Sequence, residues 1–186
     1  MRLIRVLCLS ILGMHSLSLS HVAVAGDSAA VHLPAVVLVD QDNRVQQLDR
    51  LLEGRTVVID FVFTSCKTSC SILSAIMAQV EKDVRDRLGD DVVLVSLTVD
   101  PARDTPSQLK GYAGRFATTP HWYWLTGTVP DVRQALRVFN IPVFGKPEDH
   151  PPIMMAGNIR TGQWQRWVGI PDPHAVAKMA MTMAKE

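Results

Sequence analysis

Two cysteines are the residues of this sequence best equipped for chemistry. Cys66 and Cys70 stand four positions apart, directly after an apolar segment. On a helix this spacing would put both thiols on one face, with Cβ atoms roughly 5–6 Å apart, whereas a disulfide needs about 3.5–4.5 Å. A loosened first turn would therefore permit a disulfide, and a relaxed turn would let two thiolates hold one metal ion. A helix N-terminus and Lys67 both favour thiolate, so we expect lowered pKa values for the pair.

The first 25 residues have the form of a secretory signal. Arg2 and Arg5 form a basic start, Val6–Met14 is a short apolar core, and Ala23–Ala25 supplies small residues at a cleavage site. Polar residues after Met14 interrupt the apolar run, which argues against an uncleaved anchor helix. We therefore expect cleavage after Ala25 and a periplasmic protein, with a membrane-anchored form facing the periplasm as the alternative.

Export makes the cysteine count informative. Cleavage would remove Cys8 and leave Cys66 and Cys70 as the only cysteines. A chain of this length can bury a core without stabilising disulfides, so a chemical role explains the pair better than a structural one. The composition, 47% hydrophobic and 20% charged, is that of a globular protein, and the net charge of +1 gives no basic stripe for nucleic acid. The sequence has no uninterrupted apolar run of 18 residues, so it predicts no convincing membrane span.

The patterns of apolar residues predict strands that alternate with helices. Strands are expected at 35–39, 44–48, 56–63, 91–99, 122–125, 153–156 and 164–168, and helices over about 72–88, 106–116, 128–140 and 173–184. Thr56–Phe63 and Asp91–Val99 are almost wholly apolar, as strands covered on both faces are. Such alternation implies an α/β sheet with parallel pairs. It places Cys66 at the carboxyl end of a strand, where open α/β sheets carry their sites.

Four segments in one order resemble the SCO/SenC family of copper-binding cytochrome oxidase assembly proteins. They are FVFTSCKTSC at 61–70, VSLTVDPARDTPSQLKGYAGRF at 95–116, WLTGT at 124–128 and DH at 149–150. The C-x3-C spacing, the DPxRDT string and the downstream Asp-His pair are together quite specific. The resemblance implies one thioredoxin-like α/β domain over residues 26–186, in which helices flank a central mixed sheet.

The resemblance further implies a copper site formed by Cys66, Cys70 and His150. Thiolates select Cu(I), and imidazole suits copper in either oxidation state. His150 stands in the loop GKPEDHPP before an expected strand, and Asp149 could orient its imidazole. The implied function is a chaperone that binds one copper ion, Cu(I) or Cu(II), and delivers it to an oxidase subunit during assembly of its CuA centre, or to another copper protein. A thiol–disulfide reductant would be a second partner, and membrane contact would come only through a partner or an uncleaved N-terminal segment.

A second interpretation is thiol–disulfide exchange with a partner's cysteines, in which Cys66 and Cys70 are a catalytic, redox-active pair. Asp60 lies six residues before Cys66, like the buried aspartate of thioredoxins, and Pro151-Pro152 resembles the position of the thioredoxin cis-proline. The plainer alternatives are a carboxylate at the rim of the strand and a stiff loop. Whether the protein is an enzyme stays open, and a copper sensor or scavenger without a client is a third option.

The remaining conspicuous residues have structural interpretations. In the DPARDT segment, Asp104 or Thr105 would cap the next helix and Arg103 would pair with a carboxylate, so that the segment supports the site. Met154 and Met155 could be soft copper ligands, but neighbours in a strand point to opposite faces, so they more simply alternate into the core. We expect structural roles for His32, His121, His174, Trp122, Trp124, Trp164 and Trp167.

Overall fold

The computed structural model describes residues 33–66, 69–116, 119–142 and 145–185. The expected signal sequence, His32 and Lys67 lie outside the described residues. In chain order the elements are β1 (Val37–Val39), β2 (Val45–Gln47), α1 (Leu48–Leu52), β3 (Thr56–Val62), α2 (Ser69–Asp83), the 3₁₀ turn η1 (Arg85–Arg87), β4 (Val92–Thr98), α3 (Pro106–Ala113), β5 (Trp122–Leu125), α4 (Val129–Val138), the 3₁₀ turn η2 (Pro147–Asp149), β6 (Ile153–Asn158), β7 (Gln163–Val168) and α5 (Pro173–Met183).

A five-stranded mixed sheet organises the molecule. Its strand order is β5-β4-β3-β6-β7, so β3 lies at the centre. β3 and β4, and β4 and β5, pair in parallel, whereas β6 pairs antiparallel with both β3 and β7. Every residue of β3 and β4 is buried. The expected α/β sheet with parallel pairs, flanked by helices, is confirmed.

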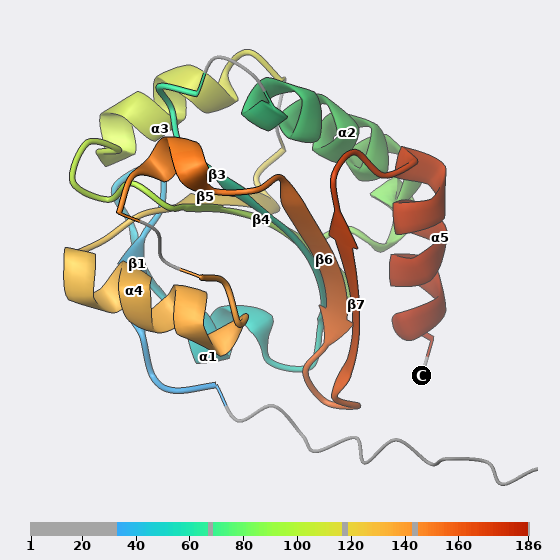
Figure 1. Cartoon of the computed structure of the whole chain (residues 1–186). Coiled ribbons are helices and arrows are strands. Elements are labelled where there is room, and N and C mark those ends of the chain that lie inside the picture. The colour runs from blue at the N-terminus through green and yellow to red at the C-terminus, as the bar shows by residue number, and fades with distance from the viewer. Residues whose placement is uncertain (1–32, 67–68, 117–118, 143–144, 186) are drawn as a thin grey trace, which may run out of the picture.

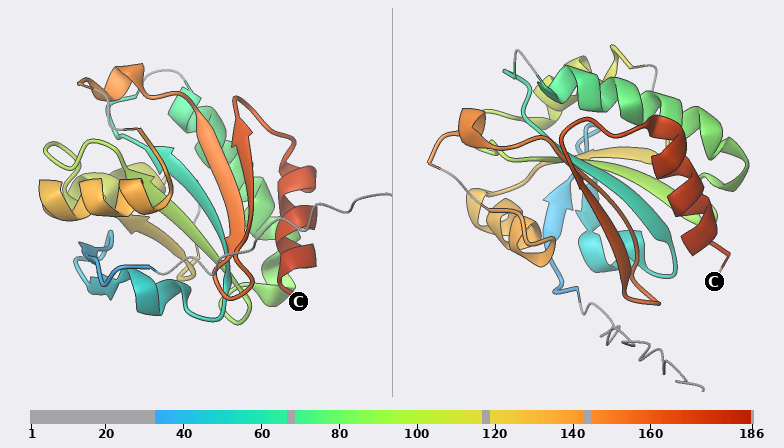
Figure 2. Two further views of the ribbon diagram at one scale, coloured as in Figure 1. Left: turned by 60° about the horizontal axis from the view of Figure 1, so that its bottom comes forward. Right: turned by 45° about the vertical axis from the view of Figure 1, so that its right-hand side comes forward.

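Helices cover both faces of this sheet. Figure 1 shows α2 and α5 on one side and α1 and α4 on the other, and the turned views of Figure 2 keep this separation. Successive side chains of β3 point to opposite faces. Val58 and Val62 pack in the core formed with α2, α3 and α5, whereas Ile59 and Phe61 pack in the core formed with α1 and α4. The residues around the end of β3 can therefore belong to either side.

The N-terminal hairpin protects one edge of the sheet. Val39 and Thr126 exchange two backbone hydrogen bonds of 2.7 and 2.9 Å beyond the end of β5. The amide side chain of Gln41 continues this pairing, because it accepts from the Trp124 N–H at 2.9 Å and donates to the Trp122 carbonyl at 3.4 Å. An exposed edge strand invites pairing with another chain, and here the hairpin occupies the edge of β5.

Helix starts follow the sequence signals closely. Thr105 caps α3 in a reciprocal capping box with Gln108, and Thr128 and Asp172 cap α4 and α5. Of the two candidates for the α3 cap, Thr105 therefore has the role, and the carboxylate of Asp104 points elsewhere.

The end of α2 differs from the prediction. The helix stops at Asp83 rather than near Leu88, and η1 follows it. Arg87, the last residue of η1, pairs with Asp91 at 2.5 Å. The chain then reverses at Gly89, whose φ of +94° is a conformation that few other residues adopt.

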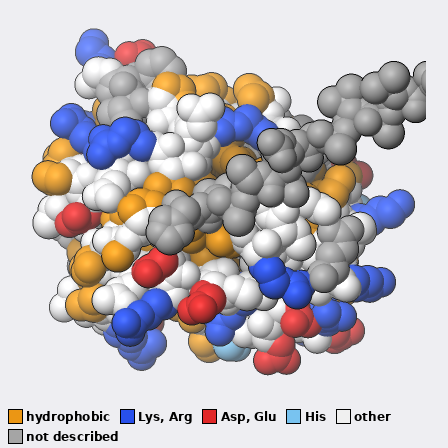
Figure 3. All heavy atoms as spheres, turned by 90° about the horizontal axis from the view of Figure 1, so that it is seen from below, with side chains coloured by type: hydrophobic (Ala, Val, Ile, Leu, Met, Phe, Trp, Pro, Cys, Tyr) orange, Lys and Arg blue, Asp and Glu red, His pale blue; other side chains and the backbone are white. Residues whose placement is uncertain are grey.

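The surface mixes charges of both signs. On the face seen in Figure 3, Lys and Arg side chains lie close to Asp and Glu side chains, with apolar atoms between them. Among the described residues, no helix has both the length and the apolar character needed to cross a bilayer.

Candidate thiol site at the carboxyl end of β3

The two cysteines lie close together between the end of β3 and the first turn of α2. Cys66 lies before the helix, and its N–H donates to the Phe63 carbonyl at 3.1 Å. Cys70 is the second residue of α2, and its backbone N–H donates to the Cys66 sulfur at 3.4 Å. Cys66 is partly exposed, whereas Cys70 is only 5% exposed. The cysteines therefore come together across the start of the helix rather than along one helical face.

The environment of Cys70 favours the protonated thiol. Burial, followed by contact with the Cys66 sulfur, raises the pKa of the Cys70 thiol well above its ordinary value. The expectation of a lowered pKa is therefore wrong for Cys70, because its side chain packs in the core between α2 and the sheet. Ionisation of this thiol needs an electrophile or a metal ion that compensates for the lost solvation.

A buried carboxyl group lies on the same side of β3. Asp60 is 0% exposed, and one of its oxygens accepts from the Ser96 hydroxyl at 2.5 Å. That hydroxyl in turn accepts from the indole N–H of Trp122 at 2.9 Å. The other oxygen of Asp60 has no hydrogen-bond partner among the described residues. Burial raises the pKa of Asp60 to about 7, and its charge also helps to raise the pKa of Cys70. The alternative of a solvent-facing carboxylate at the strand rim is wrong.

His150 lies at the same end of the sheet but packs on the other core. It follows η2, and its ring centroid lies 6.1 Å from that of Phe61. Burial lowers the pKa of His150 to about 4, so the imidazole is neutral at physiological pH. Among the described residues, no three histidine, cysteine or acidic side chains are gathered closely enough to hold a metal ion. The structure thus brings Cys66 and Cys70 together and leaves His150 across the end of β3.

The loop around His150 also bears on the thioredoxin comparison. No peptide bond among the described residues is cis, so Pro151 and Pro152 do not reproduce a cis-proline. Their interpretation as parts of a stiff loop is the one that fits.

The structural interpretations of the methionines, the tryptophans and His174 are confirmed, whereas His32 lies outside the described residues. Met154 and Met155 are buried in the two opposite cores. Trp122 and Trp124 are 0% exposed, and Trp164 and Trp167 pack at the margins of the cores. His174 pairs with Asp83 at 2.7 Å.

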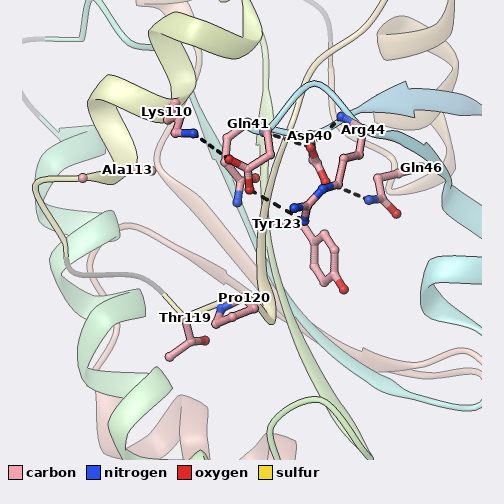
Figure 4. Close-up of a pocket in the computed structure, with 11 residues that line it drawn as sticks. Asp40, Gln41, Arg44, Gln46, Lys110, Ala113, Thr119, Pro120 and Tyr123 are labelled. Carbon is pink, nitrogen blue, oxygen red and sulfur yellow. Dashed lines mark hydrogen bonds and ion pairs between the residues drawn. The ribbon is translucent and has the colours of Figure 1, made fainter.

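A cavity of about 590 Å³ lies elsewhere, between the N-terminal hairpin and α3 (Figure 4). Lys110 and Asp42 form an ion pair of 2.9 Å across it. Asp40 accepts from the backbone of Asp42 and Arg44 and from the side chain of Gln46, at 2.8–2.9 Å. These polar groups are therefore paired with one another, while the Thr119 hydroxyl at the cavity wall has no hydrogen-bond partner among the described residues.

The fold and the site together define a class. A central strand that ends in a C-x3-C pair at the start of a helix, above a buried aspartate and within a mixed sheet, is a thioredoxin-like thiol domain. The sequence model of the SCO1/SenC family matches residues 26–157. The chain belongs to this family, as the resemblance implied.

Relatives and solved structures agree with that assignment. The SCO1 protein homolog of Bacillus subtilis is 35% identical over 89 residues, which are 47% of this chain and 45% of that protein. An SCO2-like protein of Rickettsia conorii is 33% identical over 115 residues, 60% of this chain and 54% of that protein. The matches thus span about half the length of these relatives.

Among solved structures, an SCO1/SenC family lipoprotein of Bacillus anthracis superposes with a TM-score of 0.69 at 25% identity, over 82% of this chain and 94% of that one. Arabidopsis thaliana ScoI with copper bound gives a TM-score of 0.65 at 21% identity, over 81% and 96%. At 21% identity, the similarity to the Arabidopsis thaliana structure shows a shared fold.

Proposed function

We propose that this protein binds one copper ion through Cys66, Cys70 and His150 and passes it to a partner protein. The observation that carries the proposal is the dithiol pair at the end of β3, in a chain that belongs to the SCO1/SenC family. Two sulfur ligands suit Cu(I), and one added imidazole makes the set acceptable to Cu(II). Structures of similar fold from Arabidopsis thaliana and yeast contain copper, which supports this choice of metal.

The unequal exposure of the cysteines gives them different tasks in binding. Cys66 is partly exposed and can meet the incoming ion first, whereas Cys70 is buried and protonated. Uptake of Cu(I) by the two sulfurs displaces the proton of Cys70, and the ion's charge compensates for forming a thiolate in the core. A partner that offers its own soft ligands can then take the ion through Cys66.

His150 requires a movement of its loop. Its ring now packs against Phe61, on the core opposite to that of Cys70. Ligation therefore moves residues around 147–152 toward the cysteines and exposes Phe61. Since the imidazole is neutral at physiological pH, no proton has to leave it before it binds copper.

Copper titration of single variants tests this ligand set. Cys66→Ser and Cys70→Ser should each abolish tight Cu(I) binding under anaerobic competition with a chromophoric chelator. His150→Ala should retain most Cu(I) affinity and lose Cu(II) binding and its absorption spectrum, because two thiolates still hold Cu(I). His174→Ala, which removes an exposed histidine, is the control and should match wild type. A His150→Ala protein with the wild-type Cu(II) affinity and spectrum would remove His150 from the site.

Asp149 extends the same series. If its carboxylate orients the imidazole of His150 in the copper-bound state, Asp149→Asn should lower Cu(II) affinity by about 10–100-fold, less than the loss in His150→Ala. A loss as large as that of His150→Ala would instead make Asp149 itself a ligand.

The second candidate function is thiol–disulfide exchange, and the buried Asp60 favours it. In this reaction the Cys66 thiolate attacks a partner disulfide and forms a mixed disulfide, releasing one partner thiol. The Cys70 sulfur then attacks Cys66, breaks the mixed disulfide and releases the second partner thiol. The Cys70 proton passes to the carboxylate of Asp60, directly or through water, so the partner is reduced and the pair oxidised. Turnover of a disulfide substrate with an external thiol reductant measures this activity. Turnover that persists while copper binding is absent would make exchange the leading function.

The cellular setting is part of the proposal. We place the mature protein, beginning near Gly26, in the periplasm, with a copper-receiving oxidase subunit and its CuA centre as the proposed client. Mass spectrometry of protein from its own compartment should find the N-terminus at or near Gly26. An intact Met1 chain in the membrane fraction would instead establish the anchored form.

A further inference from the structure

The segment between β4 and α3 touches both loops that carry the proposed copper ligands. It runs from Asp100 to Asp104, in the DPARDT string. Asp104 binds Thr64, two residues before Cys66, and Arg103 lies near Glu148, two residues before His150. A single short segment therefore connects two loops that stand more than eighty residues apart in the chain.

The contact with the cysteine loop is buried and well defined. Asp104 is 1% exposed, and its Oδ1 accepts from the Thr64 hydroxyl at 2.5 Å and the Thr64 N–H at 3.1 Å. Its Oδ2 accepts from the hydroxyl of Thr98, at the end of β4, at 2.5 Å. The carboxylate thus holds the residue that leaves β3 against the end of the neighbouring strand.

The same segment is anchored to the rest of the sheet on its other side. The Asp104 carbonyl accepts from the hydroxyl of Thr126 at 2.7 Å, and the Asp100 N–H donates to the Thr98 hydroxyl at 2.9 Å. Hydrogen bonds to an ionised carboxylate are stronger than those between neutral groups. The start of the cysteine loop is therefore fixed to a rigid part of the molecule.

The contact with the histidine loop is looser. Arg103 donates to the carboxylate of Asp100, which is 7% exposed, and its Nη2 lies 3.6 Å from Oε1 of Glu148. The side chains of Arg103 and Glu148 are 56% and 58% exposed. An exposed pair of this kind is weak and screened by salt, so it keeps the loop near this segment without fixing it in one position.

We infer that Asp104 and Arg103 are positioning residues that set the cysteine loop and the histidine loop relative to each other for copper binding. This inference rests on the proposed function. Asp104 acts through Thr64 and keeps the Cys66 sulfur beside Cys70, so that less ordering is needed when copper binds. Arg103 acts through Glu148 and holds the histidine loop beside the same segment.

Two threonine variants test the cysteine half. Thr64→Val removes one hydroxyl bond to the Asp104 carboxylate and keeps the backbone bond and the shape of the side chain. Thr56→Val is the matched control, because it removes a buried threonine hydroxyl at the opposite end of β3, where that hydroxyl accepts from the Asn158 side chain. Both should lower the urea midpoint of unfolding. Only Thr64→Val should also lower Cu(I) affinity, by about 10–100-fold. Equal Cu(I) affinities in the two variants would overturn this half.

A second readout separates this inference from the proposed function. The rate at which iodoacetamide alkylates Cys66 reports on that thiol without copper, and it should change in Thr64→Val and stay at the wild-type value in Thr56→Val. If wild type fails to bind copper, the proposed function fails, while a selective change in alkylation still supports positioning by Asp104. Identical alkylation rates in both variants would overturn it.

Glu148→Gln tests the histidine half, with Glu53→Gln, an exposed glutamate after α1, as the control. Glu148→Gln should weaken Cu(II) binding several-fold at low salt, and the difference from wild type should shrink in about 0.5 M salt because the ion pair is screened. A Cu(II) affinity in Glu148→Gln that equals that of Glu53→Gln at low salt would overturn the role of Arg103.

Discussion

The substitution Asp60→Asn should make the protein more stable at alkaline pH and less stable at acidic pH. Asp60 is fully buried, and burial raises its pKa from 3.8 to about 7. The folded protein therefore holds this proton more tightly than the unfolded chain does. Between about pH 4 and pH 7 the folded state binds more protons, so this carboxyl makes stability fall as the pH rises through that window.

The size of the effect follows from the two pKa values. Moving a carboxyl pKa from 3.8 to about 7 corresponds to about 4 kcal/mol of lost stability once the pH exceeds the higher value. Asparagine never ionises and so avoids this loss. Its oxygen can still accept from Ser96, but its amide hydrogens occupy the place of an oxygen that has no described partner, which costs about 1–3 kcal/mol. We expect Asp60→Asn to be about 1–3 kcal/mol more stable than wild type at pH 8 and about 1–3 kcal/mol less stable at pH 4.

Urea unfolding measures this crossing. Wild type and Asp60→Asn are unfolded with the cysteines reduced at several values between about pH 4 and pH 8. Asp90→Asn, at an exposed position, is the control and should follow wild type at every pH. A constant difference between Asp60→Asn and wild type across this range would refute the reasoning, because it would mean that Asp60 has the same pKa in the folded and unfolded states.

Three further outcomes are expected. Burial lowers the pKa of His150 from 6.5 to about 4, so the free energy of unfolding should fall as the pH drops through that window. His150→Gln should reduce this loss in the same urea series, and a loss of stability at acidic pH equal to that of wild type would contradict the prediction. Gly89→Ala should lower the free energy of unfolding by about 1–2 kcal/mol, because it forces a φ of +94° on alanine and places its Cβ against a histidine ring. Gly111→Ala, in open space on α3, should be neutral or stabilising, and equal effects of the two variants in thermal unfolding would contradict this. Oxidation of Cys66 and Cys70 to a disulfide should weaken Cu(I) binding severely in a competition titration, because it removes both thiolates; equal affinity before and after reduction would rule this out.

Most of the strands and helices could be predicted from the sequence because the signals for them are local. β5 has the predicted bounds Trp122–Leu125, and the start of α3 at Pro106 follows from a threonine cap and a first-turn proline. The almost wholly apolar β3 could be recognised as a central strand because both of its faces are covered. The end of α2 was missed because the apolar spacing continues past Asp83 into the 3₁₀ turn η1.

The site divides in the same way. The spacing of Cys66 and Cys70 brings them together in any fold that places a helix after β3, since only four positions separate them. The depth at which Cys70 lies could not be read locally, because it depends on packing against α2 and the sheet, and that packing reverses the expected direction of its pKa. Asp60 is buried for the same reason, as its neighbours Ser96 and Trp122 come from other strands.

What only the tertiary structure decided is how distant segments meet at the end of β3. By itself, the sequence determined the family, the strand and helix order, and the residue types able to bind copper. It could not show that Asp104 holds Thr64 rather than capping α3, or that His150 packs against Phe61. Both contacts join residues at least forty positions apart. They form because strand pairing brings the carboxyl ends of β3 and β4 and the start of β6 to the same end of the sheet.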